Sequence, residues 1–592
     1  MTALGSTPEA QFVPGSNVKG AVEGANWCFL LPSLELGRAV FLGAPSPSAL
    51  ATLARLSEEV AVQPNDTIHL RGPIGGHEPS KVAWVVAERD RAVPLPNESA
   101  DIVLIVGHPL TRRLVHRRRM EEEVERLLKP GGVLYVESRF AVDRGRPAGA
   151  KERPPARLER STPLWLAPAW GEMRFAAPLA DRPAIAYLER RFLNRRLLRP
   201  QLLRRPRRVI ARQPTIGRLL GRRAVLLSRS GNLDLSGPPE YVRSLAAGAG
   251  IDVTDRRWAL AAPGEYPSQK VLLFLFGPQD ARPEAVVKIT REATLNARLE
   301  NEWRALVDLR GRGIGGDGSV PQPLFFGFHA GRGVLGETAI DGARFAERTG
   351  ATADCPYALA VVDWLVELGA ATAVPAEPRS APALSELDAI FEGFMRTYRP
   401  SREHERFLDA QIAALRDGGD GLRLVFQHGD PGPWNVLLSD DGRPALLDWE
   451  AARPRGMPLW DIFHFLRSYG LAVSRADGTR DRLRSFAEHY LDGSPLSEVI
   501  VETTRRVCAR TGLAPSLVEP LFFTCWMHRA LKEAATLPPD RLARGRYVNV
   551  LQLALDRRES PGLRRLFSAA DAVGPPAERP GPFRTVGASD AC

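Results

Sequence analysis

The sequence predicts two domains of different fold class, an α/β domain followed by an α+β domain with two lobes. Continuous apolar runs alternate with helical stretches from about residue 38 to 140, which is typical of strands buried on both faces of a parallel sheet. From about residue 253 the runs indicate antiparallel strands, and after Asp341 the chain is largely helical to about Arg558. The 592 residues allow two to four folding units, at about 150 residues per domain.

The strands expected in the first domain are AVFLG (39–43), KVAWVVAE (81–88), ADIVLIVG (100–107) and GGVLYVES (131–138). Two segments of this domain resemble class I S-adenosylmethionine-dependent methyltransferases. MEEEVERLLKPGGVLYVESR (120–139) is similar to the helix-turn-strand that closes their sheet, and VPLPNESADIVLIVG (93–107) is similar to their strand after an LP turn. The resemblance implies a Rossmann-like, methyltransferase-type α/β domain over residues 25–230.

The first strand-to-helix turn of this domain departs from the pattern that binds the cofactor. The turn, FLGAPSPSALATL, keeps Gly43 but has Pro45 and Pro47 where further glycines are expected. Proline removes a backbone donor and fixes φ, and both effects oppose a close approach to a ligand. Gln63 stands where an acidic residue should end the second strand. We therefore expect a degenerate domain that binds S-adenosylmethionine weakly or not at all, with an active methyltransferase as the alternative.

The positive charge of the chain is concentrated in one segment. The formal charge is 80 − 69 = +11, and residues 151–235 alone hold 20 basic and 6 acidic side chains, a net of 20 − 6 = +14. Residues 187–223 place Leu and Ile among arginines. This pattern suits an anionic surface or an acidic partner, or else a solvated insertion. Few aromatic residues lie there, which argues against stacking on nucleic acid.

The segment FQHGDPGPWNVLLSDDGRPALLDWEAA (426–452) has the arrangement that phosphoryl transfer needs. Asp430 and Asn435 are separated by four residues, and Asp448 follows thirteen residues after Asn435. This is the spacing of a kinase catalytic loop and its second metal ligand. We expect Asp430 to orient the acceptor hydroxyl, Asn435 and Asp448 to bind Mg²⁺, and His428 to pack beneath the loop.

These motifs resemble the aminoglycoside/choline phosphotransferase family, which has a protein-kinase-like fold, over residues 246–565. The resemblance implies that Lys288, in AVVKI, reaches the nucleotide phosphates and that Glu302, in LENEWRALVDL, is its ion-pair partner. It also implies that Asp461, in MPLWDIFHF, stabilises the catalytic segment. The activity implied is a phosphotransferase that moves the γ-phosphate of ATP or GTP to a hydroxyl of a small molecule.

The loop expected over the phosphates is unusual for a nucleotide-binding loop. APGEYPSQK (262–270) lacks a GxGxxG pattern, so Gly264 would supply the turn and Ser268 a hydroxyl. A hinge is expected at 335–339, where backbone groups of Glu337 and Ala339 would meet the purine. The alternative for this segment is a plain connection between a strand and a helix.

Three further expectations concern the whole chain. Turn-forming residues predict a linker at 231–245, and a Pro-, Gly- and Ala-rich tail predicts disorder at 573–592. The five cysteines form no CxxC pair, and no apolar run approaches the length of a membrane span, so a cytoplasmic protein is expected.

Two other functions remain open. They are a bifunctional methyltransferase and kinase that modifies one metabolite or glycan, and a non-catalytic scaffold of two pseudoenzyme domains.

Overall fold

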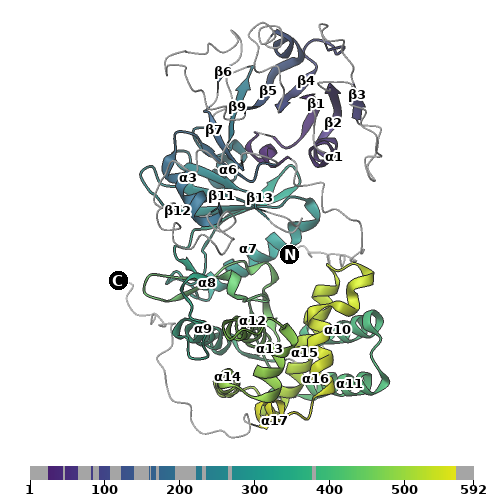
Figure 1. The fold of residues 1–592 in the computed structure, drawn as a ribbon. Helices are drawn as coiled ribbons and strands as arrows, with labels where there is room; N and C mark the ends of the chain where they lie inside the picture. Colours follow the sequence, from purple (N-terminus) through teal and green to yellow (C-terminus); the bar gives the residue numbers. More distant parts are fainter. Residues whose placement is uncertain are drawn as a thin grey trace, which may run out of the picture. The chain divides into compact units, whose positions relative to one another are not determined.

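The structure is a computed structural model, and two compact units can be separated in it (Figure 1). It describes residues 25–31, 33–43, 47–63, 82–84, 93–106, 122–138, 159–160, 162–168, 172–193, 222–229, 235–263, 270–376 and 382–568. One unit, here called the sheet unit, comprises 15–300 and 323–339. The other, the helical unit, comprises 301–322 and 340–592 together with 1–14.

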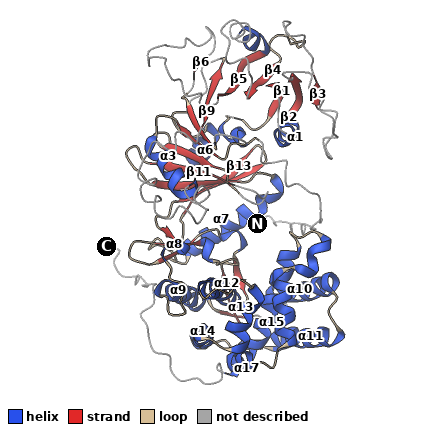
Figure 2. Cartoon of the chain, viewed as in Figure 1, coloured by secondary structure: helices blue, strands red, loops and turns tan. Residues whose placement is uncertain are grey.

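The described strands of the sheet unit form one fourteen-stranded sheet, drawn in red in the upper part of Figure 2. Its order is β13-β14-β12-β11-β10-β8-β7-β9-β5-β4-β1-β2-β3, and β6 pairs with β9. The strands are β1 (Leu36–Gly43), β2 (Ser57–Gln63), β3 (Val82–Trp84), β4 (Ala100–Val106), β5 (Leu128–Ser138), β6 (Glu159–Arg160), β7 (Leu164–Ala167), β8 (Phe175–Pro178), β9 (Arg222–Ser228), β10 (Arg257–Ala261), β11 (Val271–Phe276), β12 (Pro283–Ile289), β13 (Pro323–His329) and β14 (Arg332–Thr338).

The amino-terminal part of this sheet is parallel, as the continuous apolar runs predict. Strands β3, β2, β1, β4 and β5 pair in parallel, and β9 adds to β5 in the antiparallel direction. Helix α1 (Pro47–Leu56) connects β1 to β2, and residues 122–127 form a helical turn before β5. A mixed α/β sheet is therefore present in this half of the chain.

The sheet does not end where the amino-terminal half ends. Strand β10 pairs with β8 in the antiparallel direction through Leu260 opposite Ala176 and Ala261 opposite Phe175. The next residue, Ala262, donates its backbone N–H to the carbonyl of Arg174 at 2.7 Å. Strands β10, β11, β12, β14 and β13 then continue as an antiparallel sheet. The sequence analysis did not anticipate this junction.

Apolar side chains bury the two faces of the sheet in different ways. One face carries a single cluster that extends from Trp27 and Leu104 in the amino-terminal half to Trp258 and Val287 in the second half. Helix α6 (Glu240–Gly248) and the 3-10 turn η1 (Asn26–Leu30) contribute to this cluster. On the other face, helix α3 (Arg182–Leu188) packs in a separate cluster over the junction, with Phe175 among its buried members. Both faces of the junction are thus apolar and buried.

The helical unit contains most of the described helices, drawn in blue in the lower part of Figure 2. They are α8 (Phe345–Arg348), α9 (Pro356–Thr372), α10 (Pro382–Tyr398), α11 (Arg402–Asp417), α12 (Trp460–Ala476), α13 (Arg482–Phe486), α14 (Pro495–Thr511), α15 (Val518–Ala534), α16 (Arg546–Asp556) and α17 (Pro561–Ser568). Helix α7 (Asn296–Gly311) begins in the sheet unit and ends in the helical unit. No helix in the described ranges is long and apolar enough to cross a membrane.

Two three-stranded sheets carry the segment of interest in the helical unit. One has the order β15 (Ala343–Arg344), β18 (Val436–Leu438) and β19 (Pro444–Leu446). The other has the order β16 (Val374–Pro375), β17 (Arg423–Gln427) and β20 (Arg453–Gly456). Fully buried tryptophans, Trp364, Trp449 and Trp526, belong to the core against which these strands pack. The loops between the strands are therefore anchored at both ends.

Several expectations fall on residues outside the described ranges. These are Gly264 and Ser268 of the expected phosphate loop, most of the basic segment 187–223, and the tail 573–592. The linker expected at 231–245 is described only from Leu235, and α6 begins within it at Glu240. Residues on both sides of that segment belong to the sheet unit. The domain boundaries and the roles of these residues stay predictions.

Candidate active site

The loop that follows β17 has a backbone shape that requires glycine. Gly429 has φ +79°, and a Cβ atom at this position would overlap the carbonyl of Ala451. Only glycine meets both conditions without strain. The chain then passes Asp430 and forms the 3-10 turn η8 (Pro433–Asn435) before entering β18. This local shape places Asp430 and Asn435 on one short loop.

Asp461 in the first turn of α12 holds the backbone of this loop. One carboxylate oxygen accepts the N–H of His428 at 2.6 Å, and the other accepts the N–H of Gly429 at 3.1 Å. The carboxyl group is buried, and burial raises the pKa of Asp461. A buried carboxylate that accepts two backbone bonds fixes the loop more firmly than a neutral side chain would.

His428, which precedes Gly429 in the loop, is fully buried. Its Nδ1 accepts the backbone N–H of Asp430 at 3.2 Å, and its Nε2 lies 3.0 Å from the carbonyl oxygen of Leu447. These two contacts assign the proton to Nε2. Burial lowers the pKa of His428, so the ring is neutral and connects Asp430 to the strand that leads to Asp448.

The carboxylate of Asp430 faces cations and an indole. Oδ1 lies 3.2 Å from Nη1 of Arg529 and 3.1 Å from Nε2 of His464, and Oδ2 accepts Nε1–H of Trp434 at 3.3 Å. Burial acts to raise the pKa of Asp430, but the contact with His464 and the charges of Arg529 and Lys532 hold it well below its usual range. Asp430 is therefore ionised at neutral pH and suits an acceptor of a hydrogen bond from a hydroxyl.

Asn435 and Asp448 belong to backbone segments that are hydrogen-bonded to each other. The side-chain amide of Asn435 donates to the carbonyl of Asp430 at 3.0 Å, and its backbone carbonyl accepts the N–H of Leu447 at 2.8 Å. The second bond ties Asn435 to the residue just before Asp448. Asp448 adopts a left-handed conformation, with φ +70°, which costs energy for a non-glycine residue. An amide oxygen and a carboxylate are ligands that fit Mg²⁺, which commonly completes its shell with water and phosphate oxygens.

Helix α7 anchors the segment after Asp448 within the helical unit. Glu302, which is fully buried, accepts the backbone N–H of Trp449 at 3.0 Å. Its neighbour Asn301 donates to the carbonyls of Glu450 and Ala452 at 3.1 and 2.9 Å. Glu302 thus contacts the Asp-Trp-Glu triplet directly, a contact that the sequence analysis did not foresee.

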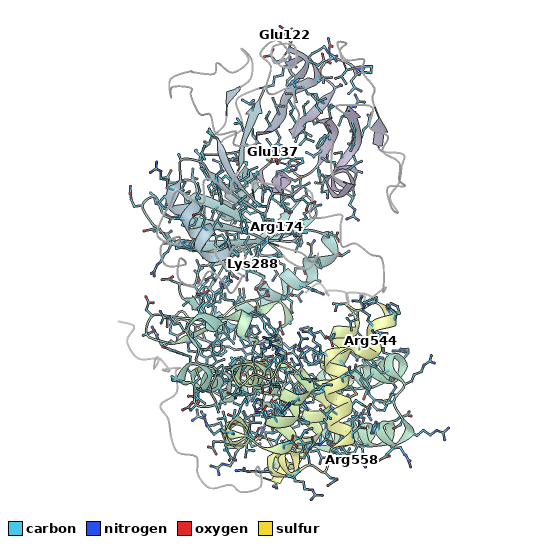
Figure 3. The ribbon with its side chains drawn as sticks, in the orientation of Figure 1. Glu122, Glu137, Arg174, Lys288, Arg544 and Arg558 are labelled. Carbon is cyan, nitrogen blue, oxygen red and sulfur yellow. The ribbon has the colours of Figure 1, made fainter. Side chains whose placement is uncertain are left out.

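Lys288 lies on β12 of the sheet unit and is almost fully buried (Figure 3). Its Nζ is 2.8 Å from Oε1 of Glu337 on the neighbouring strand β14. The backbone N–H of Ala339, also expected at the hinge, donates to the carbonyl of Glu284 at 2.8 Å. The predicted pairing of Lys288 with Glu302 and the predicted purine contacts of Glu337 and Ala339 stay predictions.

The sequence analysis missed three residues around Asp430. His464 lies on α12 three residues after Asp461, and Arg529 and Lys532 lie on α15. The spacing of Asp461 and His464 on one helical face was a usable signal, because residues three apart in a helix are neighbours. No local signal connects α15 to the loop, because Arg529 follows Asp430 by 99 positions in the sequence.

Comparison with known proteins identifies the segment that contains this site. Residues 273–496 match the phosphotransferase enzyme family, APH. The phosphotransferase resemblance of the Asp430 segment is therefore confirmed for residues 273–496, with a kinase-like fold. A search of the curated proteins finds no match to this chain.

Three solved structures are distant matches. An aminoglycoside phosphotransferase, APH(3'')-Id from Streptomyces rimosus, in complex with ADP and streptomycin, is 15% identical over 48% of this chain and 90% of its own, with a TM-score of 0.28. WbdD, in complex with a kinase inhibitor, is 12% identical over 91% of this chain and 87% of its own, with a TM-score of 0.21. A putative methyltransferase from Haloferax volcanii, solved with the Trm112 activator, is 17% identical over 36% of this chain and 92% of the matched chain, with a TM-score of 0.24.

Proposed function

We propose that this protein is a kinase that transfers the γ-phosphate of ATP or GTP to a hydroxyl of a small molecule. The observation that carries the proposal is the ionised carboxylate of Asp430 on a loop clamped by Asp461 and His428. The family match of residues 273–496 supports the same reaction class. In the reaction, the acceptor oxygen bonds to the γ-phosphorus while the bond from phosphorus to the β–γ bridging oxygen breaks. The nucleoside diphosphate leaves.

Asp430 acts mainly by orientation in this mechanism. Its pKa is held well below the usual range, so the carboxylate is a weak base that accepts the hydroxyl hydrogen bond and aligns the oxygen. Such a base suits phosphoryl transfer, because the loose transition state needs the hydroxyl proton to leave only late. The proton then passes to Asp430 and on to water. Arg529, 3.2 Å from Asp430, keeps the carboxylate ionised and in place.

The remaining site residues would position the nucleotide. Asn435 and Asp448 would hold the Mg²⁺ that neutralises charge on the phosphates, and Lys288 would reach the phosphates from β12. In the sheet unit, Glu337 is the carboxylate that fixes the Lys288 ammonium. Gly264 and Ser268 would cover the phosphates, and the segment with Glu337 and Ala339 would border the purine.

The test is magnesium-dependent release of ADP by the full-length protein with a panel of hydroxylated acceptors. Replacing Asp448→Ala should lower turnover by about a thousandfold or more and weaken Mg-nucleotide binding, because it removes a metal ligand. Asp441→Ala is the matched control, since this exposed carboxylate lies in the turn between β18 and β19 and bonds only Ser439 and Arg443. An Asp448→Ala protein with a near-normal rate would rule out the mechanism. Absence of Mg-nucleotide binding in the unchanged protein would instead favour the non-catalytic scaffold.

We further propose that the amino-terminal part of the sheet unit is a degenerate methyltransferase-type domain. Support comes from the parallel order β3-β2-β1-β4-β5 followed by the antiparallel β9. Strand β1 ends at Gly43 and α1 begins at Pro47, so only three residues are left for the turn. Gln63 ends β2 opposite Leu42, so the side chain at this position is an amide and not the carboxylate expected to bind ribose hydroxyls.

A further inference from the structure

We propose that the acceptor of this kinase is an anion, a hydroxylated molecule that also carries a phosphate or a carboxylate. The inference rests on the proposed function and names the substrate class of the same site. It comes from the residues around Asp430, here called the cationic cluster. The cluster consists of Arg467 on α12, Arg529 and Lys532 on α15, and Arg546 on α16.

Arg467 is the member that most clearly lacks a counter-ion. It is 8% exposed, and its buried Nη2 has no hydrogen-bond partner among the residues that the structure describes. No carboxylate forms an ion pair with it in the described part of the chain. Its guanidinium instead lies over the ring of Tyr547, with Cζ 5.0 Å from the ring centre. Burial lowers the pKa of Arg467, and the nearby charges of Arg546 and Arg482 act in the same direction. A buried guanidinium without a carboxylate is costly unless a bound anion compensates it.

The other three cations surround the loop that holds Asp430. Arg529 contacts Asp430 directly, and Nζ of Lys532 lies 3.4 Å from the carbonyl oxygen of Gly429. Arg546 is paired with Glu533 at 2.6 Å, and its Cζ lies 5.6 Å from the same Tyr547 ring that Arg467 covers. After Asp430 and Glu533 have neutralised Arg529 and Arg546, Lys532 and Arg467 remain without a carboxylate at ion-pair distance among the described residues. The surface beside the catalytic carboxylate is therefore positive.

A buried histidine adds a second polar group without a partner. His464 is fully buried, with Nε2 3.1 Å from Oδ1 of Asp430 and its ring centre 6.1 Å from that of Tyr547. Its Nδ1 has no hydrogen-bond partner among the described residues. Burial and the charge of Arg529 lower the pKa of His464 to about 3, so the imidazole is neutral. A neutral ring next to Asp430 can exchange a hydrogen bond with a polar acceptor group.

This arrangement favours an anionic acceptor over a cationic one. Guanidinium groups bind phosphate and carboxylate through paired, charge-assisted hydrogen bonds. An amine-bearing acceptor would meet like charge from Arg467 and Lys532. Trp434, 61% exposed, donates to Asp430 and has its ring centre 6.0 Å from that of His464. Its indole offers an apolar surface for the carbon skeleton between the hydroxyl and the anionic group.

The same cations could instead stabilise the phosphoryl group during transfer, and the two roles predict different results. Stabilisation of the transferring group would affect every acceptor equally. Recognition of an anion on the acceptor would affect only acceptors that carry one. Matched pairs of acceptors therefore separate the two roles.

The experiment uses the full-length protein with Mg-ATP and sugars or polyols assayed in three forms, namely the neutral compound, its monophosphate and the corresponding carboxylic acid. We expect kcat/KM to be about tenfold to a hundredfold higher for an anionic form than for its neutral counterpart, the range of one or two charge-assisted bonds. Comparison of the phosphate and acid arms identifies which anion the site takes. Inorganic phosphate should compete with the preferred acceptor.

Variants then assign the effect to the cationic cluster. Arg467→Gln and Lys532→Gln should lower kcat/KM for the anionic acceptor about tenfold more than for the neutral one. Arg467→Lys should restore part of the preference, and the exposed Lys532 provides a test if Arg467→Gln does not fold. Arg558→Gln, at the opposite end of α16 from Arg544 in Figure 3, is the control and should change neither value.

Two failures can be told apart. Turnover that prefers neutral or cationic acceptors, or variants that slow all acceptors equally, would overturn this inference and leave the kinase proposal intact. Absence of both Mg-nucleotide binding and slow, Asp448-dependent nucleotide hydrolysis would overturn the kinase proposal itself.

Discussion

The loop around Asp430 and the end of strand β1 differ in the contacts of their described residues. In the helical unit, the backbone of the loop is bonded to Asp461, and the backbone after Asp448 is bonded to Glu302. In the sheet unit, the residues that lead to the turn, Phe41 and Leu42, are buried and apolar. Buried polar groups are costly unless they are hydrogen-bonded, so the bonds that hold this loop indicate a site whose geometry matters. An apolar strand end requires only packing.

The largest expected effect concerns the two hydrogen bonds from the backbone of His428 and Gly429 to Asp461, here called the clamp. It tests whether the clamp, rather than the fold alone, supports activity. Asp461→Asn replaces one carboxylate oxygen with an NH2 group that cannot accept a hydrogen bond, so only one of the bonds from the N–H groups of His428 and Gly429 can be kept. We expect turnover to fall by about a hundredfold or more and the free energy of unfolding to fall by about 1–3 kcal/mol. Steady-state kinetics and denaturant unfolding measure the two effects. Unchanged kcat with reduced stability would show that the clamp only supports the fold.

The next effect tests packing in the sheet unit. Phe175→Ala removes a ring from the buried cluster under α3, where it lies 5.4 Å from the ring of Phe192. We expect the free energy of unfolding to fall by about 3 kcal/mol, as for other buried Phe→Ala changes. Phe328→Ala on β13 is the control, because this side chain is 52% exposed. Equal losses in the two variants would contradict the assigned packing.

A smaller effect concerns the pH dependence of stability, which we expect to depend on the buried His464 of the helical unit. His464 faces Asp430, Arg529, Arg467 and Tyr547, and its pKa is lowered to about 3, against about 6.5 in an unfolded chain. Because the unfolded state binds the proton more tightly, stability falls as pH decreases below about 6.5, by about 1.4 kcal/mol per pH unit for this residue, until pH 3 is approached.

Denaturant unfolding at pH 7, 6 and 5, followed by tryptophan fluorescence, measures this slope. His464→Gln should make it shallower, even if the variant is less stable at every pH. A slope that is the same in the variant would contradict the neutral, buried state of His464.

The smallest expected effect is the absence of a ligand response in the sheet unit. Pro45 and Pro47 have no backbone N–H to donate, and Gln63 stands where the carboxylate that would bind the ribose is expected. We expect calorimetry of the full-length protein with S-adenosylmethionine to show no binding at micromolar concentrations. A dissociation constant in the low micromolar range would contradict this expectation and favour the bifunctional alternative.

Sequence alone could predict the elements whose signals are local. Asp430, Asn435 and Asp448 lie within one short segment, so their spacing shows the loop directly, and continuous apolar runs such as ADIVLIVG mark parallel strands. Lys288 and Glu337 lie diagonally across two paired strands, so their contact depends on a register that only the fold sets. Arg529 contacts Asp430 from α15, which follows the loop by many residues, and no repeating pattern in the sequence indicates this contact. The pairing of β8 with β10 could not be predicted from the sequence either, because short apolar strands do not specify the strand with which they pair.

That junction also bears on the solubility of parts of the chain. An open sheet exposes backbone N–H and C=O groups at each edge strand, and such edges recruit other chains. By pairing β8 with β10, the protein covers one edge of each half, and the described path of the sheet ends only at β13 and β3. Cutting the chain near residue 235 would uncover both edges and the apolar side chains around them. We therefore expect either half to self-associate when produced alone, and the intact chain to be the unit that resists aggregation.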